Sequence, residues 1–227
     1  MQPHIRYLAK LSAPLLCLAA SYVLGEAGPD TRVIVRNMQA AWARAVDYRV
    51  KVEVRTYKAD GSFATQKFLY TFKKPDRIRL DLEWPHPGMV LIFPDKEGKV
   101  FVEPSGIGRF FHLHLRPDSS LLIGSSAQRI DQTDLGLLVR HISYDLTDGR
   151  RGPAEAVDED GSSVIHVRAA DHFRPDTVTC YRFFIDRTTW LPVRVEESTP
   201  EGRPERSVAF DGLTINTGVP DSLFRTE

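Results

Sequence analysis

The stretch FLYTFKKPDRIRLDLEWP, residues 68–85, contains the pattern that decides the fold. Its apolar side chains recur at every second position, first at 68, 70 and 72 and then at 78, 80 and 82. A period of two is typical of a strand that buries one face. Because Pro75 interrupts the pattern, the stretch predicts two successive strands that present one shared apolar face.

The same period extends to both sides of this stretch. In YRVKVEVRTY, residues 48–57, three valines alternate with charged residues, which predicts a strand with one solvent-exposed face. Further strands are predicted at residues 89–93, 99–104, 109–115, 163–169, 178–186, 190–198 and 206–216. Strands at such regular spacing, with few helices between them, indicate a mainly β (α+β) domain built on an antiparallel sheet.

Two segments have helical spacing instead. After Asp30 or Thr31, either of which can cap a helix, apolar residues recur at helical spacing until about residue 47. A second stripe consists of Leu135, Leu138, Val139 and Ile142. We therefore expect one helix before the sheet and one inserted between two sets of strands. Residues 149–163 are rich in glycine and charge, which predicts a long exposed loop.

Residues 1–25 have the layout of a signal peptide. Arg6 and Lys10 precede an apolar run at residues 11–24, which is shorter than the roughly 20 residues that span a bilayer. We expect cleavage between residues 25 and 30 and export to the periplasm. The remaining chain, residues 26–227, is then a single domain of the larger β kind.

Charge and cysteine content argue against a protein that binds nucleic acid through its overall charge and against a fold that is stabilised by disulfides. Residues 1–25 hold two of the 30 Lys and Arg residues and none of the 30 Asp and Glu residues, so the exported chain has 28 − 30 = −2 net charge. Such a chain has no overall attraction to nucleic acid. Only Cys180 remains after export, so packing and not disulfides must stabilise the fold.

A search for catalytic chemistry yields one weak candidate. His112 and His114 lie at alternate positions of a predicted strand, so their imidazoles point to the same side and could share a metal ion. A zinc site needs three or four ligands, and the remaining histidines show no motif spacing. The alternative to a metal site is that both histidines are solvent-facing or hydrogen-bonded residues of a strand. We therefore predict that the protein is not an enzyme and that it binds no metal and no cofactor.

Three phrases carry a family resemblance. They are residues 68–85, then FPDKEGKVFVEP at residues 93–104, then the long closing segment FFIDRTTWLPVRVEESTPEGRPERSVAFDGLTINTGVPDSLF at residues 183–224. In this order the chain resembles the LolA/LolB-like superfamily of periplasmic lipoprotein carriers, whose type member is an outer-membrane lipoprotein chaperone. The resemblance covers most of the exported chain.

The resemblance implies a curved antiparallel sheet of about eleven strands that forms a half-open barrel capped by helices. It also implies an inner surface that accepts acyl chains. The family carries an arginine before the proline of the first phrase, where it helps to close a helical lid. Here Lys74 stands at that position, and lysine lacks the planar fork of arginine. Lys74 is a candidate for a headgroup or lid contact.

The expected ligand site combines this resemblance with the strand alternation. The residues expected to line an apolar cavity are Phe68, Tyr70, Phe72, Ile78, Leu80, Leu82 and Ile92. The stripe of Leu135, Leu138, Val139 and Ile142 is expected to lie across the mouth of the half barrel as a movable lid. The alternative is that the helices cover the sheet completely and leave a core without a cavity.

Three functions remain open at this point. The first is a periplasmic carrier that binds a lipid or an acylated lipoprotein and exchanges it with a membrane-bound donor or acceptor protein. The second is a sensor or regulatory module of the same fold that reports the state of the envelope. The third is a hydrolase whose site the sequence does not reveal.

Overall fold

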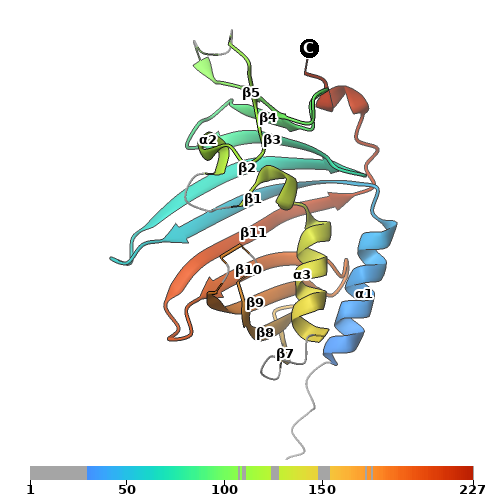
Figure 1. Cartoon of the computed structure of the whole chain (residues 1–227). Helices are drawn as coiled ribbons and strands as arrows, with labels where there is room; N and C mark the ends of the chain where they lie inside the picture. The colour runs from blue at the N-terminus through green and yellow to red at the C-terminus, as the bar shows by residue number, and fades with distance from the viewer. Residues whose placement is uncertain are drawn as a thin grey trace, which may run out of the picture.

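The computed structural model describes residues 30–226 except 107, 109, 110, 124–127, 148–153, 172 and 175. Its main feature is one sheet of eleven antiparallel strands in the order β6-β5-β4-β3-β2-β1-β11-β10-β9-β8-β7. The edge strands β6 and β7 do not pair with each other, so the curved sheet stays open (Figure 1). The predicted fold, a mainly β half barrel, is confirmed.

The strands form two meanders that meet in the middle of the sheet, where β1 pairs with β11. The first meander consists of β1 (Asp47–Tyr57), β2 (Phe63–Lys73), β3 (Arg77–Trp84), β4 (Val90–Phe93), β5 (Val100–Glu103) and β6 (Leu113–Leu115). The second consists of β7 (Glu155–Glu159), β8 (Ser162–Ala170), β9 (Val178–Asp186), β10 (Pro192–Ser198) and β11 (Pro204–Ile215).

Both predicted long helices are present. Helix α1 (Thr31–Arg44) begins after Asp30, whose carboxylate accepts a hydrogen bond from the backbone N–H of Arg32 at 2.9 Å. Helix α3 (Leu135–Thr147) follows the first meander, and the Asp134 carboxylate accepts from the N–H of Leu137 at 3.0 Å. These side chains satisfy N–H groups that a helix leaves without intrahelical partners. Figure 1 shows α1 and α3 side by side across the half of the sheet that contains β8 to β11.

Aromatic residues join the helices to the centre of the sheet. The ring of Tyr48 on β1 stacks on Phe72 at a centroid distance of 5.1 Å and on Tyr70 at 5.7 Å. Trp42 of α1 packs on the same rings, 6.1 Å from Tyr48 and 5.7 Å from Phe72. Aromatic pairs in such arrangements add to the stabilisation gained from burial alone. This cluster fixes α1 against the first two strands.

The outer face of the first meander has its own small cover. The 3₁₀ helix η4 (Asp221–Phe224) packs near the C-terminus against β3, and Val219 and Phe224 form an apolar cluster there with Ile92 and Phe101. The Lys73 ammonium donates to the carbonyl of Val219 at 2.9 Å. The sheet therefore buries apolar side chains on both faces in this region.

One predicted loop proved wrong. Residues 149–163 were expected to form a long exposed loop, whereas Glu155–Glu159 form the edge strand β7, which pairs with β8. The segment is charged because an edge strand exposes one face and one side to solvent, and only Ala156 of this strand is buried. The short helices α2 (Ser120–Ile123) and η3 (Ile130–Gln132) were also not predicted.

The contact between the two helices gives a stability prediction. A Cβ atom at Gly136 on α3 would overlap the Trp42 indole of α1. At an exposed helical position a change from Gly to Ala stabilises a protein by up to about 1 kcal/mol. Because of the overlap, we expect Gly136→Ala to lower the free energy of unfolding by about 1–3 kcal/mol in urea denaturation. The exposed Arg140→Ala on the same helix is the control and should change it by less than about 0.5 kcal/mol.

Candidate functional site

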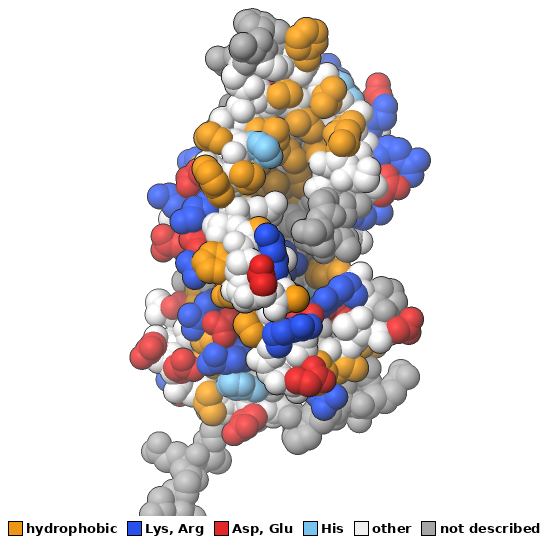
Figure 2. All heavy atoms as spheres, turned by 90° about the vertical axis from the view of Figure 1, so that its left-hand side faces the viewer, with side chains coloured by type: hydrophobic (Ala, Val, Ile, Leu, Met, Phe, Trp, Pro, Cys, Tyr) orange, Lys and Arg blue, Asp and Glu red, His pale blue; other side chains and the backbone are white. Residues whose placement is uncertain are grey.

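A cavity of about 560 Å³ opens on the inner face of the sheet. Strands of the first meander form its floor, β10 and β11 border it on one side, and α2, η3 and α3 lie over it. Most of its lining is apolar, including Leu80, Leu82, Met89, Leu91, Leu115, Leu122, Leu137, Leu138 and Val208. In Figure 2 hydrophobic side chains gather around a hollow in the upper part of this face.

The strand residues predicted from the alternation divide into two groups. Phe68, Tyr70, Leu80 and Leu82 line the cavity. Phe72 and Ile78 pair with each other in the register of β2 and β3 and share the inner face, but each is only 2% exposed and belongs to the closed core. The aromatic cluster with Trp42 covers Phe72, so the cavity begins beyond this point along the strands.

Ile92 lies on the opposite face from the one expected. It pairs with Arg79 of β3 and with Phe101 of β5, and it contributes to the outer apolar cluster under η4. The neighbouring Leu91 pairs with Leu80 and lines the cavity instead. A strand turns successive side chains to opposite faces, so an uninterrupted apolar run does not reveal which residues face inward.

The expected lid residues also divide into two groups. Leu138 lines the cavity together with Leu137. Leu135, Val139 and Ile142, by contrast, are fully buried against the sheet and α1. A helix that buries three of its four stripe residues in the core forms a wall of the cavity in this structure, and a movement of this helix as a lid stays a prediction.

Hydrogen bonds hold this wall in place. The N–H of Leu135 donates to the Tyr48 hydroxyl at 3.1 Å. Because the Thr133 hydroxyl donates to the carbonyl of Ile130 at 2.7 Å, it accepts from the Tyr70 hydroxyl at 3.0 Å. Burial raises the pKa of both tyrosines well above the usual value, so both remain neutral donors and acceptors.

Lys74 contacts a helix end and not the cavity. Its ammonium donates to the carbonyl of Trp42 at 2.9 Å and to that of Ala43 at 3.4 Å, and it lies 4.7 Å above the Trp42 ring. A positive charge is favourable at a helix C-terminus, where carbonyl groups lack intrahelical partners. Lys74 thus fixes the end of α1 in this structure, and a headgroup or latch contact of this residue stays a prediction.

Sequence reasoning missed the polar part of the cavity. Glu197 on β10 and Arg206 on β11 are direct cross-strand partners, and both line the cavity together with Gln128. Both occupy inward positions of their strands, in line with the apolar residues Val195 and Val208. The sequence did contain a sign of this feature. In each of two adjacent strands, a charged residue stands where the alternation of that strand would place an inward-facing apolar residue.

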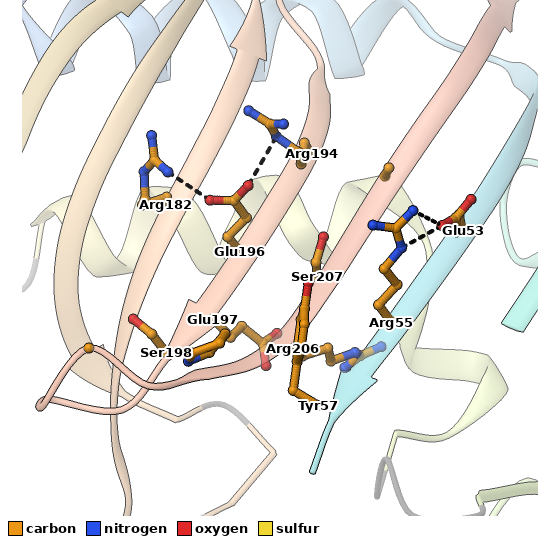
Figure 3. Close-up of a pocket in the computed structure, with 13 residues that line it drawn as sticks. Glu53, Arg55, Tyr57, Arg182, Arg194, Glu196, Glu197, Ser198, Arg206 and Ser207 are labelled. Atoms are coloured by element: carbon orange, nitrogen blue, oxygen red, sulfur yellow. Dashed lines mark hydrogen bonds and ion pairs between the residues drawn. The ribbon is translucent and has the colours of Figure 1, made fainter. Parts of the chain in front are cut away.

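A hollow of about 590 Å³ on the outer face has a different character (Figure 3). Glu196 pairs with Arg182 at 2.8 Å, and Glu53 pairs with Arg55. The Arg194 guanidinium lies 3.6 Å above the ring of Phe184. Because acidic and basic side chains neutralise one another here, this surface is a weaker candidate for a ligand site.

The two strand histidines share the outer face, as their spacing predicts. His114 Nδ1 lies 2.7 Å from the Asp95 carboxylate, and both His112 and His114 pack on the ring of Phe101. The His114 side chain helps to lower the pKa of Asp95, against the effect of burial. Among the described residues, no group of three or more His, Cys, Asp or Glu lies close enough together to hold a metal ion. In the same part of the chain no helix is long and apolar enough to cross a membrane.

Comparisons with known proteins identify the fold. No family model matches the chain, and no curated protein matches it. MucB, known from Pseudomonas aeruginosa, is 14% identical with a TM-score of 0.51, over 87% of this chain and 63% of that chain. An uncharacterised conserved protein from Thermus thermophilus is 8% identical with a TM-score of 0.50, over 87% of this chain and 94% of that one.

A LolA superfamily protein from Nitrosomonas europaea is 10% identical with a TM-score of 0.40, and the match covers 86% of this chain and 97% of that one. At such identities a comparison shows the fold alone. The likeness to MucB and to the Thermus thermophilus protein agrees with the predicted fold and carries no function to this chain. This chain spans less than two thirds of MucB.

The division between core and cavity gives a second stability prediction. Phe72→Ala removes a buried ring from the aromatic cluster, so we expect a loss of about 3–5 kcal/mol in the free energy of unfolding. Leu82→Ala on the adjacent strand should cost only roughly 1 kcal/mol, because the side chain faces the cavity and is half-exposed. Urea denaturation measures both. Equal losses would contradict the assignment of these residues to core and cavity.

Proposed function

We propose that this protein is an exported carrier that binds a lipid, or the acyl chain of a lipoprotein, in the cavity on the inner face of its sheet. The observation that carries this proposal is the largely apolar lining of a cavity of about 560 Å³. Protein sites for small ligands have volumes of about 300–1,000 Å³ and mostly apolar walls.

Acyl chains fit this lining on energetic grounds. Each buried methylene contributes about 0.8 kcal/mol, so a chain alone provides useful affinity without a cofactor or a catalytic group. Trp84 and Leu121 line the cavity and are nonetheless 57% and 78% exposed. An apolar rim of this kind supports exchange of a lipid with a membrane-bound donor or acceptor protein.

A second candidate function is an envelope sensor. The likeness to MucB favours it, since MucB has been solved in complex with MucA(peri). The two functions differ in an observable property. A carrier moves a fluorescent lipid from donor vesicles to acceptor vesicles, whereas a sensor binds the lipid or a protein partner without such transfer.

Ligand binding can be tested with two neighbouring residues of β11. Val208 lines the cavity, whereas Ser207 faces the outer side of the sheet. We expect Val208→Trp to fill the cavity and to weaken binding of a fluorescent fatty acid by about tenfold or more, because the indole displaces part of the chain. Ser207→Trp is the matched control and should bind like the wild type. Fluorescence titration measures both, with circular dichroism as the check on folding.

The export proposal concerns residues outside the described part of the chain. A signal peptide at residues 1–25 would be removed during export, so the mature N-terminus should lie between Glu26 and Asp30. N-terminal sequencing of protein recovered from the envelope gives the answer. A chain that retains Met1 in a cytoplasmic fraction would contradict the proposed localisation.

A further inference from the structure

The cavity is polar at one end and apolar at the other. Its lining from β3 to β6 consists mainly of large apolar residues such as Leu80, Leu91 and Leu115. Its border at β10 and β11 contains Glu197 and Arg206. Between β3 and β11 lie β2 and β1, so the two ends are separated by three strand spacings, or about 14 Å. An elongated ligand with two chemically different ends fits such a cavity.

Arg206 is held at this polar end by one partner. Its Nη2 atom donates to the Gln128 side-chain oxygen at 2.7 Å, and Gln128 in turn donates through Nε2 to the carbonyl of Gln132 at 2.9 Å. The Nε atom of Arg206 is buried without a hydrogen-bond partner among the described residues. The guanidinium is therefore fixed in position while part of its capacity to donate is unused.

Glu197 does not fully neutralise this charge. It lies directly across from Arg206 in the strand register, yet the two side chains attract each other without a hydrogen bond. Burial raises the pKa of the Glu197 carboxyl, and Arg206 opposes that effect. A raised pKa means a smaller share of the charged form at any given pH, and hence less negative charge beside Arg206.

Nearby charged groups are already committed to other contacts. Arg174 pairs with Asp171 at 2.7 Å and with Glu205 at 2.8 Å. Asp134, which also lines the cavity, accepts a hydrogen bond from the start of α3. Arg206 is the only Lys or Arg among the described residues that line the cavity, and together with Glu197 it also lines the hollow on the outer face.

On the basis of the proposed function, we infer that Arg206 binds the anionic head group of a single-chain amphiphile, such as the carboxylate of a fatty acid. The acyl chain lies toward β3 to β6, and Gln128 holds the guanidinium in place. A carboxylate accepts two hydrogen bonds from a guanidinium fork, and burial in an apolar cavity strengthens this pair.

The test compares a charged ligand with its neutral counterpart. Dansyl-labelled undecanoic acid and its methyl ester share one chain and differ at the head. We expect the wild-type protein to bind the acid about tenfold more tightly than the ester, the range of a charge-assisted hydrogen bond. Arg206→Gln should abolish this preference by weakening only the acid, whereas Arg206→Lys should retain most of it because the charge remains.

Three further measurements sharpen the result. Arg55→Gln on the outer face of the sheet is the control and should keep the preference, because its guanidinium pairs with Glu53. Glu197→Gln should retain or increase affinity for the acid, since it removes a neighbouring negative charge, and a loss would overturn the inference. Inorganic phosphate and acetate should not displace the probe, and displacement by either would mean that a free anion and not an amphiphile is the ligand.

The outcomes separate this inference from the proposed function. If the wild-type protein binds neither the acid nor the ester, the proposed function is wrong. If it binds both equally well, and Arg206→Gln changes neither affinity, the cavity binds chains but the head-group site is wrong. Circular dichroism shows whether each variant is folded. The comparison of acid and ester on the wild-type protein decides the question even if Arg206→Gln does not fold.

Discussion

The structure depends on how one open sheet of eleven strands buries its inner face. Such a face is too wide for two helices to cover. Helices α1 and α3 pack against β8, β9 and β10 and complete an ordinary core there. Over the first meander the cover is thinner, and the apolar side chains of β2 to β6 border a cavity. The candidate site therefore follows from the mismatch between the area of the sheet and the area of the helices.

The border between core and cavity is set by the anchoring of α3. Tyr48 stacks on the rings of β2 and also binds the first turn of α3, so one residue joins sheet, core and helix. Gly136 allows Trp42 to approach the same turn closely. These contacts hold α3 in place as a wall of the cavity. Trp84 and Leu121 line the cavity and are exposed, so the cavity borders solvent beside them and not beside the buried stripe of α3.

Much of this architecture could be predicted from the sequence, because strict alternation identifies both a strand and its inward face. Phe68, Tyr70, Leu80 and Leu82 line the cavity, and the alternation had assigned them to the inward face. Alternation is absent from the run at residues 89–93, so Ile92 could not be assigned to a face until its pairing with Arg79 was known. Whether an inward residue contacts a helix or borders a cavity depends on tertiary packing. For this reason Phe72 lies in the closed core whereas Phe68, on the same face of the same strand, lines the cavity.

The polar end of the cavity was hidden for a related reason. In sequence, Glu197 and Arg206 look like solvent-facing residues of a hairpin, because they stand among other charged side chains. Their inward position becomes clear only from the structure, in which Val195 and Val208 pair with each other on the inner face and Glu197 and Arg206 are the next pair on that same face. Charge at an inward position costs desolvation energy, which hydrophobic packing alone does not repay. Two such residues side by side in a largely apolar lining therefore indicate a functional constraint, and the proposed anionic head group beside Arg206 would offset that cost.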